Sequence, residues 1–284
     1  MMPPRPYRQV DVFTAQACMG NPVGVVMDAS GWDTAMMQRF TDWTNLSECT
    51  FVLPPTPQGQ ESGADYQVRI FCPGRELPFA GHPTLGTCHA WLEMGGQPRA
   101  ADVVQECGVG LVRVRRQNGR LAFAAPPLRR QGPLSEQDLA RLVHGLGLQP
   151  HEVIAHSWCD NGPAWRGLLL QDANRVRKVQ PDPIALKDWE VGLIAPQDAD
   201  GDTAFEVRAF FPGHGGLAED PVTGSLNAAM AQWLISTGRA PKRYTAAQGS
   251  CMGRAGRVYI EQDATQTVWV GGDTVTCIRG HVPW

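Results

Sequence analysis

The chain has 284 residues, 43% hydrophobic and 19% charged, and its 25 Lys and Arg against 28 Asp and Glu give a formal net charge of −3. High apolar content with low net charge excludes a disordered chain, and the missing basic excess argues against nucleic acid as the main partner. The length fits one large domain or two of about 142 residues each.

The N-terminus and the cysteines favour a reducing compartment. The opening sequence MMPPRPYRQVDVF lacks the apolar core of a secretory signal, and no run of 18 apolar residues occurs. Eight cysteines occur without a C-x-x-C pair, so the sequence predicts free thiols and no metal site. We therefore expect a cytoplasmic protein with no membrane partner.

The first quarter of the chain alternates strands with one helix. Residues 9–13 and 23–27 have strand patterns, and Gly20-Asn21-Pro22 between them is typical of a turn. Residues 32–44 are expected to form a helix. Its apolar positions at helical spacing are Trp32, Met36, Phe40 and Trp43.

A helix-to-strand connection follows, and it carries Glu48. The next segment, 50–53, has a strand pattern, and the composition of residues 54–64 predicts a loop. A strand is expected at 66–71, followed by a Pro-Gly turn. A second helix is expected to open at Pro83 and to stop before Gly95-Gly96, because proline suits a first turn and glycine a helix end.

The middle of the chain contains a hairpin, a linker and a capped helix. Residues 111–116 and 121–125 flank Asn118-Gly119, which favours a tight turn. Arginines alternate with valines on the first strand, which indicates a solvated face. Residues 126–133 resemble a linker, and a helix is expected to begin at the N-cap Ser135 with Asp138 three residues on. Its buried stripe is Leu139, Leu142, Val143 and Leu146.

The most informative feature is an internal repeat. VRIFCPG at 68–74 recurs as VRAFFPG at 207–213, and HPTLGT at 82–87 is answered by DPVTGS at 220–225. A weaker echo pairs Asn21-Pro22 with Gly162-Pro163. The three echoes keep the same order, at offsets near half the chain length, so they indicate two copies of one fold. We place the domains at 1–128 and 129–284, with the final strand a candidate to return to the first.

Duplication suggests where a ligand binds. Each copy has a strand, a Pro-Gly turn, a polar N-cap and a proline-led helix, with His82 and Asp220 as the expected caps. Helix N-termini offer unpaired N–H groups and a partial positive charge. We expect both helix starts to face one cleft between the domains and to bind a small carboxylate there.

Three segments resemble one known family. NLSECTF at 45–51, ELPFAGHPTLG at 76–86 and AEDPVTGSLNAA at 218–229 are similar to the PhzF-type phenazine biosynthesis isomerases, and the resemblance covers nearly the whole chain. It implies the α+β fold of diaminopimelate epimerase: two pseudo-symmetric domains, each with antiparallel strands wrapped round a central helix. It also implies a homodimer and an isomerase that moves a proton within a small unsaturated carboxylate without a cofactor.

The resemblance also assigns the site residues. Glu48 is expected to be the general acid/base, with His82 and Asp220 beside the substrate. Gly81, Gly224 and Ser225 are expected to bind it at the helix starts. An unperturbed glutamate is a poor acid at neutral pH, so we expect burial to raise the pKa of Glu48.

Other interpretations remain open from the sequence. Glu48 could pair with an arginine, His82 and Asp220 could only cap helices, and Ser225 could serve only the backbone. A two-thiol racemase is disfavoured, because the second copy places Leu226 where the first has Cys88. An epimerase with two other bases, or a metabolite-binding or interaction protein without activity, would have the same fold.

The substrate is not evident from the sequence. Cys49 stands beside the glutamate, where relatives usually carry a small hydroxyl residue, and Cys72 precedes the first Pro-Gly turn. We expect the surroundings of Cys49, Cys72 and His214 to decide which acid is bound. No nucleotide-binding glycine motif is present, so a nucleotide cofactor has no support.

Overall fold

The computed structural model describes residues 4–117, 119–198, 201–213 and 215–283. The chain divides into two compact units, residues 1–124 with 271–284, and residues 125–270. Two residues used in the sequence argument, the hairpin residue Asn118 and the pocket candidate His214, lie outside the described part of the chain.

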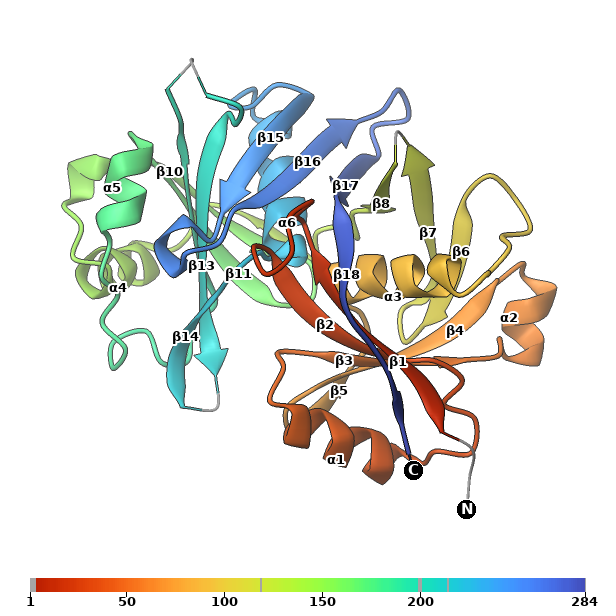
Figure 1. The fold of residues 1–284 in the computed structure, drawn as a ribbon. Helices are drawn as coiled ribbons and strands as arrows, with labels where there is room; N and C mark the ends of the chain where they lie inside the picture. The colour runs from red at the N-terminus through yellow and green to blue at the C-terminus, as the bar shows by residue number, and fades with distance from the viewer. Residues whose placement is uncertain (1–3, 118, 199–200, 214, 284) are drawn as a thin grey trace. The chain divides into compact units, whose positions relative to one another are not determined.

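The first unit is a curved mixed sheet with a helix at its centre (Figure 1). Its strands are β1 (Arg5–Val12), β2 (Asn21–Val26), β3 (Cys49–Leu53), β4 (Tyr66–Cys72), β5 (Arg75–Leu77), β6 (Val103–Cys107), β7 (Gly110–Gln117), β8 (Arg120–Ala124) and β18 (Thr274–Val282). Its helices are α1 (Thr34–Thr44), α2 (Pro57–Glu61) and α3 (Gly81–Glu93).

The strands of the first unit pair in the order β18-β1-β2-β3-β4-β6-β7-β8. Two of these pairs, β2–β3 and β4–β6, are parallel, and the others are antiparallel. Each parallel pair is joined through a helix, α1 or α3, because a parallel neighbour requires a crossover connection. The sheet is therefore mixed and not purely antiparallel.

The second unit repeats this design. Its strands are β9 (Arg130–Gly132), β10 (Val153–Asp160), β11 (Ala164–Leu170), β12 (Val191–Pro196), β13 (Phe205–Gly213), β14 (Gly216–Asp220), β15 (Arg243–Gln248), β16 (Gly256–Gln262) and most of β17 (Val268–Gly272). Its helices are α4 (Glu136–Gly145), α5 (Ala173–Lys178) and α6 (Gly224–Ser236), with short 3-10 turns η1 (Pro150–Glu152) and η2 (Ser250–Met252).

The pairing order of the second unit matches the first seven strands in the order of the first unit. The order is β9-β10-β11-β12-β13-β15-β16, and the parallel pairs β11–β12 and β13–β15 occupy the same places as β2–β3 and β4–β6. Strand β4 carries VRIFC and β13 carries VRAFF, so the repeated sequences form equivalent strands. The expected α+β fold class and its duplication are confirmed.

The central helices α3 and α6 explain why each sheet curls. Each has 13 residues, nine of them buried, and both are apolar all round. A helix without a polar face must be covered on every side. Within the first unit, α3 contacts strands at both ends of the pairing order, including β18, β1 and β8. The strands therefore wrap around it.

Several predicted elements match the structure, and the capped helix is the clearest. Helix α4 begins after Ser135, whose hydroxyl accepts a hydrogen bond from the backbone N–H of Asp138 at 3.1 Å. Leu142 of this helix and its C-cap residue Leu146 are almost fully buried in the core of the second unit. The hairpin β7–β8 also forms, with Gln117 opposite Arg120.

Four local predictions were wrong. Asn21 and Pro22 already belong to β2, since both pair with β1. The expected loop at 54–64 contains α2, which Thr56 caps by accepting from the Gly59 N–H. The expected linker contains β9, which gains a partner in β10. Trp43 is 79% exposed, because Met37 and Phe40 on the neighbouring turns face the core.

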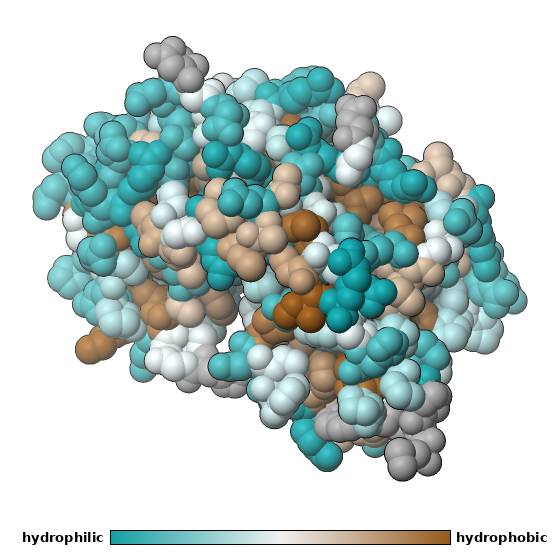
Figure 2. Space-filling model, viewed as in Figure 1, coloured by the Kyte–Doolittle hydropathy of each residue, from teal (hydrophilic) through white to brown (hydrophobic). Residues whose placement is uncertain are grey.

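The outer surface is largely polar where it carries short helices. On the face drawn in Figure 2, hydrophilic side chains cover the region of α4 and α5. Over the residues that the structure describes, no helix is long and apolar enough to cross a membrane.

Close contact between α3 and β2 gives a prediction about stability. A Cβ added at Gly86 would lie 2.3 Å from Val23 Cγ1 and 3.1 Å from Val12 Cγ2. We expect Gly86→Ala to lower the free energy of unfolding by about 1–3 kcal/mol, because overpacking outweighs alanine's better helix propensity. Urea unfolding measures the change.

Gly280→Ala is the matched control, because a Cβ there has no atom within 4 Å. It should change the free energy of unfolding by less than about 0.5 kcal/mol. Equal stabilities of the two variants would show that α3 does not need a glycine at the β2 contact.

Candidate active site

Glu48 lies in the short connection between α1 and β3, as the sequence predicts. Helix α1 ends at Asn45, which adopts the left-handed conformation with φ 59°, so the chain turns sharply there. The Glu48 carbonyl accepts a hydrogen bond from the Gly24 N–H at 3.3 Å, which ties the connection to β2. The Glu48 side chain is 17% exposed. A mostly buried carboxylate is thus held at a fixed place.

His82 is the residue that the structure brings to Glu48. Its Nε2 lies 3.3 Å from Glu48 Oε2, and its Nδ1 lies 3.3 Å from the amide nitrogen of Asn21. The ring is almost fully buried. Burial lowers the pKa of His82 from 6.5 to about 3, although a hydrogen bond with the Pro22 backbone acts in the opposite direction. His82 is therefore a neutral ring at neutral pH.

The expected role of His82 as a helix cap was wrong. Helix α3 begins at Gly81, the N-cap is Ala80, and no side chain caps the helix. Pro83 is the third helical residue, where its missing N–H costs no intrahelical hydrogen bond. His82 thus lies inside the first turn, and its ring is available to Glu48.

Three cysteines of the first unit are protonated thiols. Burial raises the pKa of Cys49 to about 11, and the charge of Glu48 adds a smaller effect. Burial also raises the pKa of Cys72, and the charge of Glu48 acts in the same direction. Burial raises the pKa of Cys88 to about 12. These thiols are poor bases, which agrees with the argument against a two-thiol racemase.

Asp220 lies in the second unit, at the end of β14. Its Oδ2 accepts a hydrogen bond from the Thr223 hydroxyl at 2.6 Å. The expected N-cap role of Asp220 was wrong, because α6 begins at Gly224 and Thr223 is its N-cap residue. Asp220 instead pairs with Ala209 as a strand residue.

Gln248 holds the turn between Asp220 and α6. It is 1% exposed, and its Nε2 donates to the Asp220 carbonyl at 3.0 Å and to the Thr223 hydroxyl at 2.9 Å. Its Oε1 accepts from the Thr223 N–H at 3.0 Å. One buried amide therefore fixes the segment that the sequence singled out as DPVTG.

Ser225 is the second residue of α6, beside the buried Gly224. Its Oγ accepts a hydrogen bond from the Trp165 indole N–H at 3.1 Å, and its carbonyl accepts from the Asn161 amide at 2.9 Å. Because the indole is a donor only, the serine hydroxyl keeps its hydrogen for another partner. Gly81 and Gly224 begin α3 and α6, so the backbone N–H groups of both are free of intrahelical bonds.

The structure thus groups the predicted residues within each unit. Glu48, His82 and Gly81 lie together in the first unit, and Asp220, Gly224 and Ser225 lie together in the second. Two supporting residues were missed. The sequence contained a signal for Asn21, because this residue belongs to the weakest echo of the repeat. It contained no signal for Gln248, because a single glutamine near the end of a strand forms no recognisable pattern.

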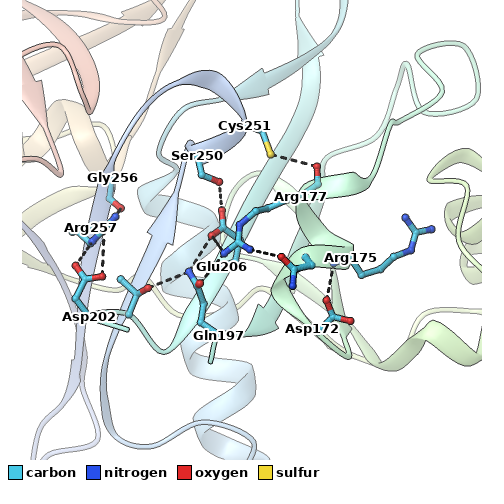
Figure 3. Close-up of polar contacts among 12 residues, drawn as sticks. Asp172, Arg175, Arg177, Gln197, Asp202, Glu206, Ser250, Cys251, Gly256 and Arg257 are labelled. Atoms are coloured by element: carbon cyan, nitrogen blue, oxygen red, sulfur yellow. Dashed lines mark hydrogen bonds and ion pairs between the residues drawn. The ribbon is translucent and has the colours of Figure 1, made fainter. Parts of the chain in front are cut away.

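A second polar cluster in the second unit has a structural role. Glu206 is 1% exposed, and its carboxylate accepts hydrogen bonds from Arg177 at 3.1 Å, from Gln197 at 3.0 Å and from Ser250 (Figure 3). A buried charge is stable only when it is paired and hydrogen-bonded. These contacts join α5, β13 and η2, and they satisfy the carboxylate.

The burial of His82 gives a prediction about pH. An unfolded chain binds a proton on this histidine below pH 6.5, whereas the folded protein does so only near pH 3. The free energy of unfolding should therefore fall as pH drops through this window, by up to about 1.4 kcal/mol per pH unit for this proton. Urea unfolding between pH 7 and pH 4 measures the slope.

In His82→Gln the contribution of this histidine to the pH dependence of the free energy of unfolding should be lost. The exposed His281 provides the control, since His281→Gln removes a histidine without touching the site. A pH slope that is the same in wild type and His82→Gln would contradict the neutral, buried state of the ring.

Comparison with known proteins places the chain among related sequences. The family model for phenazine biosynthesis-like proteins, PhzC-PhzF, matches residues 10–280. The chain is 33% identical to antisense-enhancing sequence 1 of Schizosaccharomyces pombe, over 96% of this chain and 97% of that protein. It is also 33% identical to the trans-2,3-dihydro-3-hydroxyanthranilate isomerase of Pseudomonas aeruginosa, over 90% of each.

A solved structure agrees with the sequence match. The PhzF-family protein of Enterococcus faecalis superposes with a TM-score of 0.79 at 25% identity, covering 99% of this chain and all of that one. The resemblance seen in the three sequence segments is therefore confirmed over the whole chain. The chain belongs to the PhzC-PhzF family of phenazine biosynthesis-like proteins, and it is an enzyme of the isomerase class.

Proposed function

We propose that the enzyme moves a proton within a small unsaturated carboxylate, without a cofactor, and that Glu48 is its general acid/base. The observation that supports this most is the Glu48–His82 pair, in which a mostly buried carboxylate lies 3.3 Å from a neutral, buried imidazole. General bases act from such positions, within hydrogen-bond reach of the reacting group.

The proposed reaction has two proton transfers. The Glu48 carboxylate takes a proton from an activated carbon, and the C–H electron pair spreads into the unsaturated acid. The same carboxyl group then returns the proton to a different carbon, which restores the carboxylate and moves the double bond. Between these steps, N–H groups stabilise the charge on the substrate, and the His82 ring is one such donor.

Substrate binding is assigned to the helix starts. The backbone N–H groups at Gly81 and Gly224 and the Ser225 hydroxyl are donors suited to a carboxylate. Asp220 is assigned the complementary role, as an acceptor for an amino or hydroxyl group of the substrate. The Thr223 hydroxyl donates to its Oδ2 and holds this carboxyl group in place.

Trans-2,3-dihydro-3-hydroxyanthranilate is the first substrate to test, since the relative from Pseudomonas aeruginosa is named for its isomerisation. It is a carboxylic acid with double bonds, an amino group and a hydroxyl group, so it supplies each group that the proposed site residues bind.

The role of Glu48 is tested in deuterated water. Wild-type enzyme should convert the acid and place deuterium at the carbon that receives the proton, because Glu48 exchanges with solvent. We expect Glu48→Gln to lower kcat by roughly 10²–10⁴-fold, since an amide cannot carry the proton. Mass spectrometry and NMR of the product measure turnover and label.

Glu61→Gln is the control, because Glu61 is an exposed residue of α2. Unchanged turnover in Glu48→Gln would contradict the proposed role of Glu48 as general acid/base. Inversion of a stereocentre, read as a change in optical rotation with no shift of a double bond, would assign the chemistry to an epimerase.

Ser225 gives a separate prediction about binding. Ser225→Ala removes a hydroxyl donor but keeps the helix start, so KM should rise about 10-fold or more, while kcat changes little. Steady-state kinetics with the same acid measure both constants. A fall in kcat at constant KM would instead place the hydroxyl at the reacting carbon.

A further inference from the structure

The Glu48–His82 pair depends on a third side chain, that of Asn21. This residue begins β2 and is fully buried. Its Nδ2 lies 3.3 Å from His82 Nδ1, and its Oδ1 accepts a hydrogen bond from the Ser47 hydroxyl at 3.5 Å. Asn21 therefore connects the ring of His82 with the residue that precedes Glu48.

The chemistry of the amide decides which ring nitrogen carries the hydrogen. An amide nitrogen is a donor only, and a neutral imidazole has one donor and one acceptor nitrogen. If Asn21 Nδ2 donates to His82 Nδ1, then Nδ1 is the acceptor and the hydrogen lies on Nε2. That nitrogen is the one 3.3 Å from Glu48 Oε2.

The Pro22 backbone is the competing partner of the ring. Proline has no N–H, so only its carbonyl can take part, and that bond needs a hydrogen on the ring nitrogen that faces it. A hydrogen on Nδ1 would leave the Nε2 lone pair facing the Glu48 carboxylate, which is repulsive while that group is ionised. Both the Asn21 donor and the carboxylate therefore favour the hydrogen on Nε2.

We propose that Asn21 is a positioning residue that holds His82 in the tautomer with its hydrogen on Nε2, the ring nitrogen that lies 3.3 Å from Glu48 Oε2. The inference rests on the proposed function only in treating Glu48 and His82 as the reacting pair. In this tautomer the Nε2–H group lies 3.3 Å from Glu48 Oε2, next to the reacting carboxylate, where it is the ring donor available to charge that develops on a bound substrate.

The second unit also has a buried asparagine at the first turn of its central helix. Asn161 lies two positions before Pro163, whereas Asn21 directly precedes Pro22, and Asn161 is 7% exposed. Its Nδ2 donates to the Ser225 carbonyl at 2.9 Å, in the first turn of α6. In each copy a buried asparagine close to a proline thus hydrogen-bonds a group in the first turn of the central helix.

The test reads the tautomer directly. Protein labelled with ¹⁵N-histidine, studied without substrate at pH 7, reports which ring nitrogen bears hydrogen through long-range ¹H–¹⁵N correlations. Wild type should show the hydrogen on Nε2 of His82. Asn21→Asp replaces the donor with an acceptor of the same shape and should move the hydrogen to Nδ1, and Asn21→Ala should give a mixture.

Gln105→Ala is the matched control for a lost buried amide. Gln105 is also fully buried, and its Nε2 donates to Thr84 in the same first turn of α3. This variant should lose stability, yet keep the wild-type tautomer and kcat. Asn21→Ala should lower kcat about 10-fold or more, the loss expected for one hydrogen bond at a reacting group.

A wild-type spectrum with the hydrogen on Nδ1 would overturn the inference, as would an unchanged tautomer in Asn21→Asp. Asn21→Asp serves as the second variant if Asn21→Ala does not fold. A correct tautomer together with full activity of Glu48→Gln would leave the role of Asn21 intact and refute the proposed function.

Discussion

Each unit is built around a central helix that has no polar, solvent-exposed face. Nine of the 13 residues of α3 are buried, and the same holds for α6. An amphipathic helix can bury its apolar side against one face of a sheet, but these helices are apolar all round and need strands on every side. The first turn of each helix therefore begins inside the unit, and its polar groups must find partners on the strands. Asn21, Gln248 and Trp165 supply them.

Burial of the first turn also sets the chemistry open to His82. A histidine at the surface would titrate near neutral pH and could act as an acid. The almost complete burial of this ring keeps it neutral, so its contribution is a hydrogen bond and not a charge. Glu48, which has the greater exposure of the two, is then the group suited to carry the proton. This proposed division of roles follows from where the helix begins.

The sequence predicts the duplicated fold well, because its signals are local or repeated. VRIFCPG and VRAFFPG form equivalent strands, and Ser135 caps α4 as its spacing indicates. The predicted helix caps were wrong, because the motif does not indicate where the preceding strand ends. Strand β14 extends through Asp220, whereas its counterpart β5 ends at Leu77, so α6 starts after the aligned aspartate and α3 starts before the aligned histidine.

The grouping of Glu48 with His82 needed the fold or the family resemblance. The two residues are 34 positions apart in sequence, and they meet because β2 lies beside β3 while α3 packs on β2. Asn21 shows the same limit. A Gly-Asn-Pro segment is typical of a turn, yet pairing with β1 draws it into a strand and turns its amide toward α3.

Divergence between the copies explains how one fold can supply unlike groups. Both begin the central helix with glycine, and both use a buried amide to hold its first turn. The first copy places an imidazole there, which requires a partner that sets its tautomer. The second places Asp220 before the helix, where Thr223 and Gln248 hold it as a strand residue. The backbone design is thus conserved between copies while the chemistry at the helix start is free to differ. The proposed reaction requires that freedom, because proton transfer and carboxylate binding need different side chains.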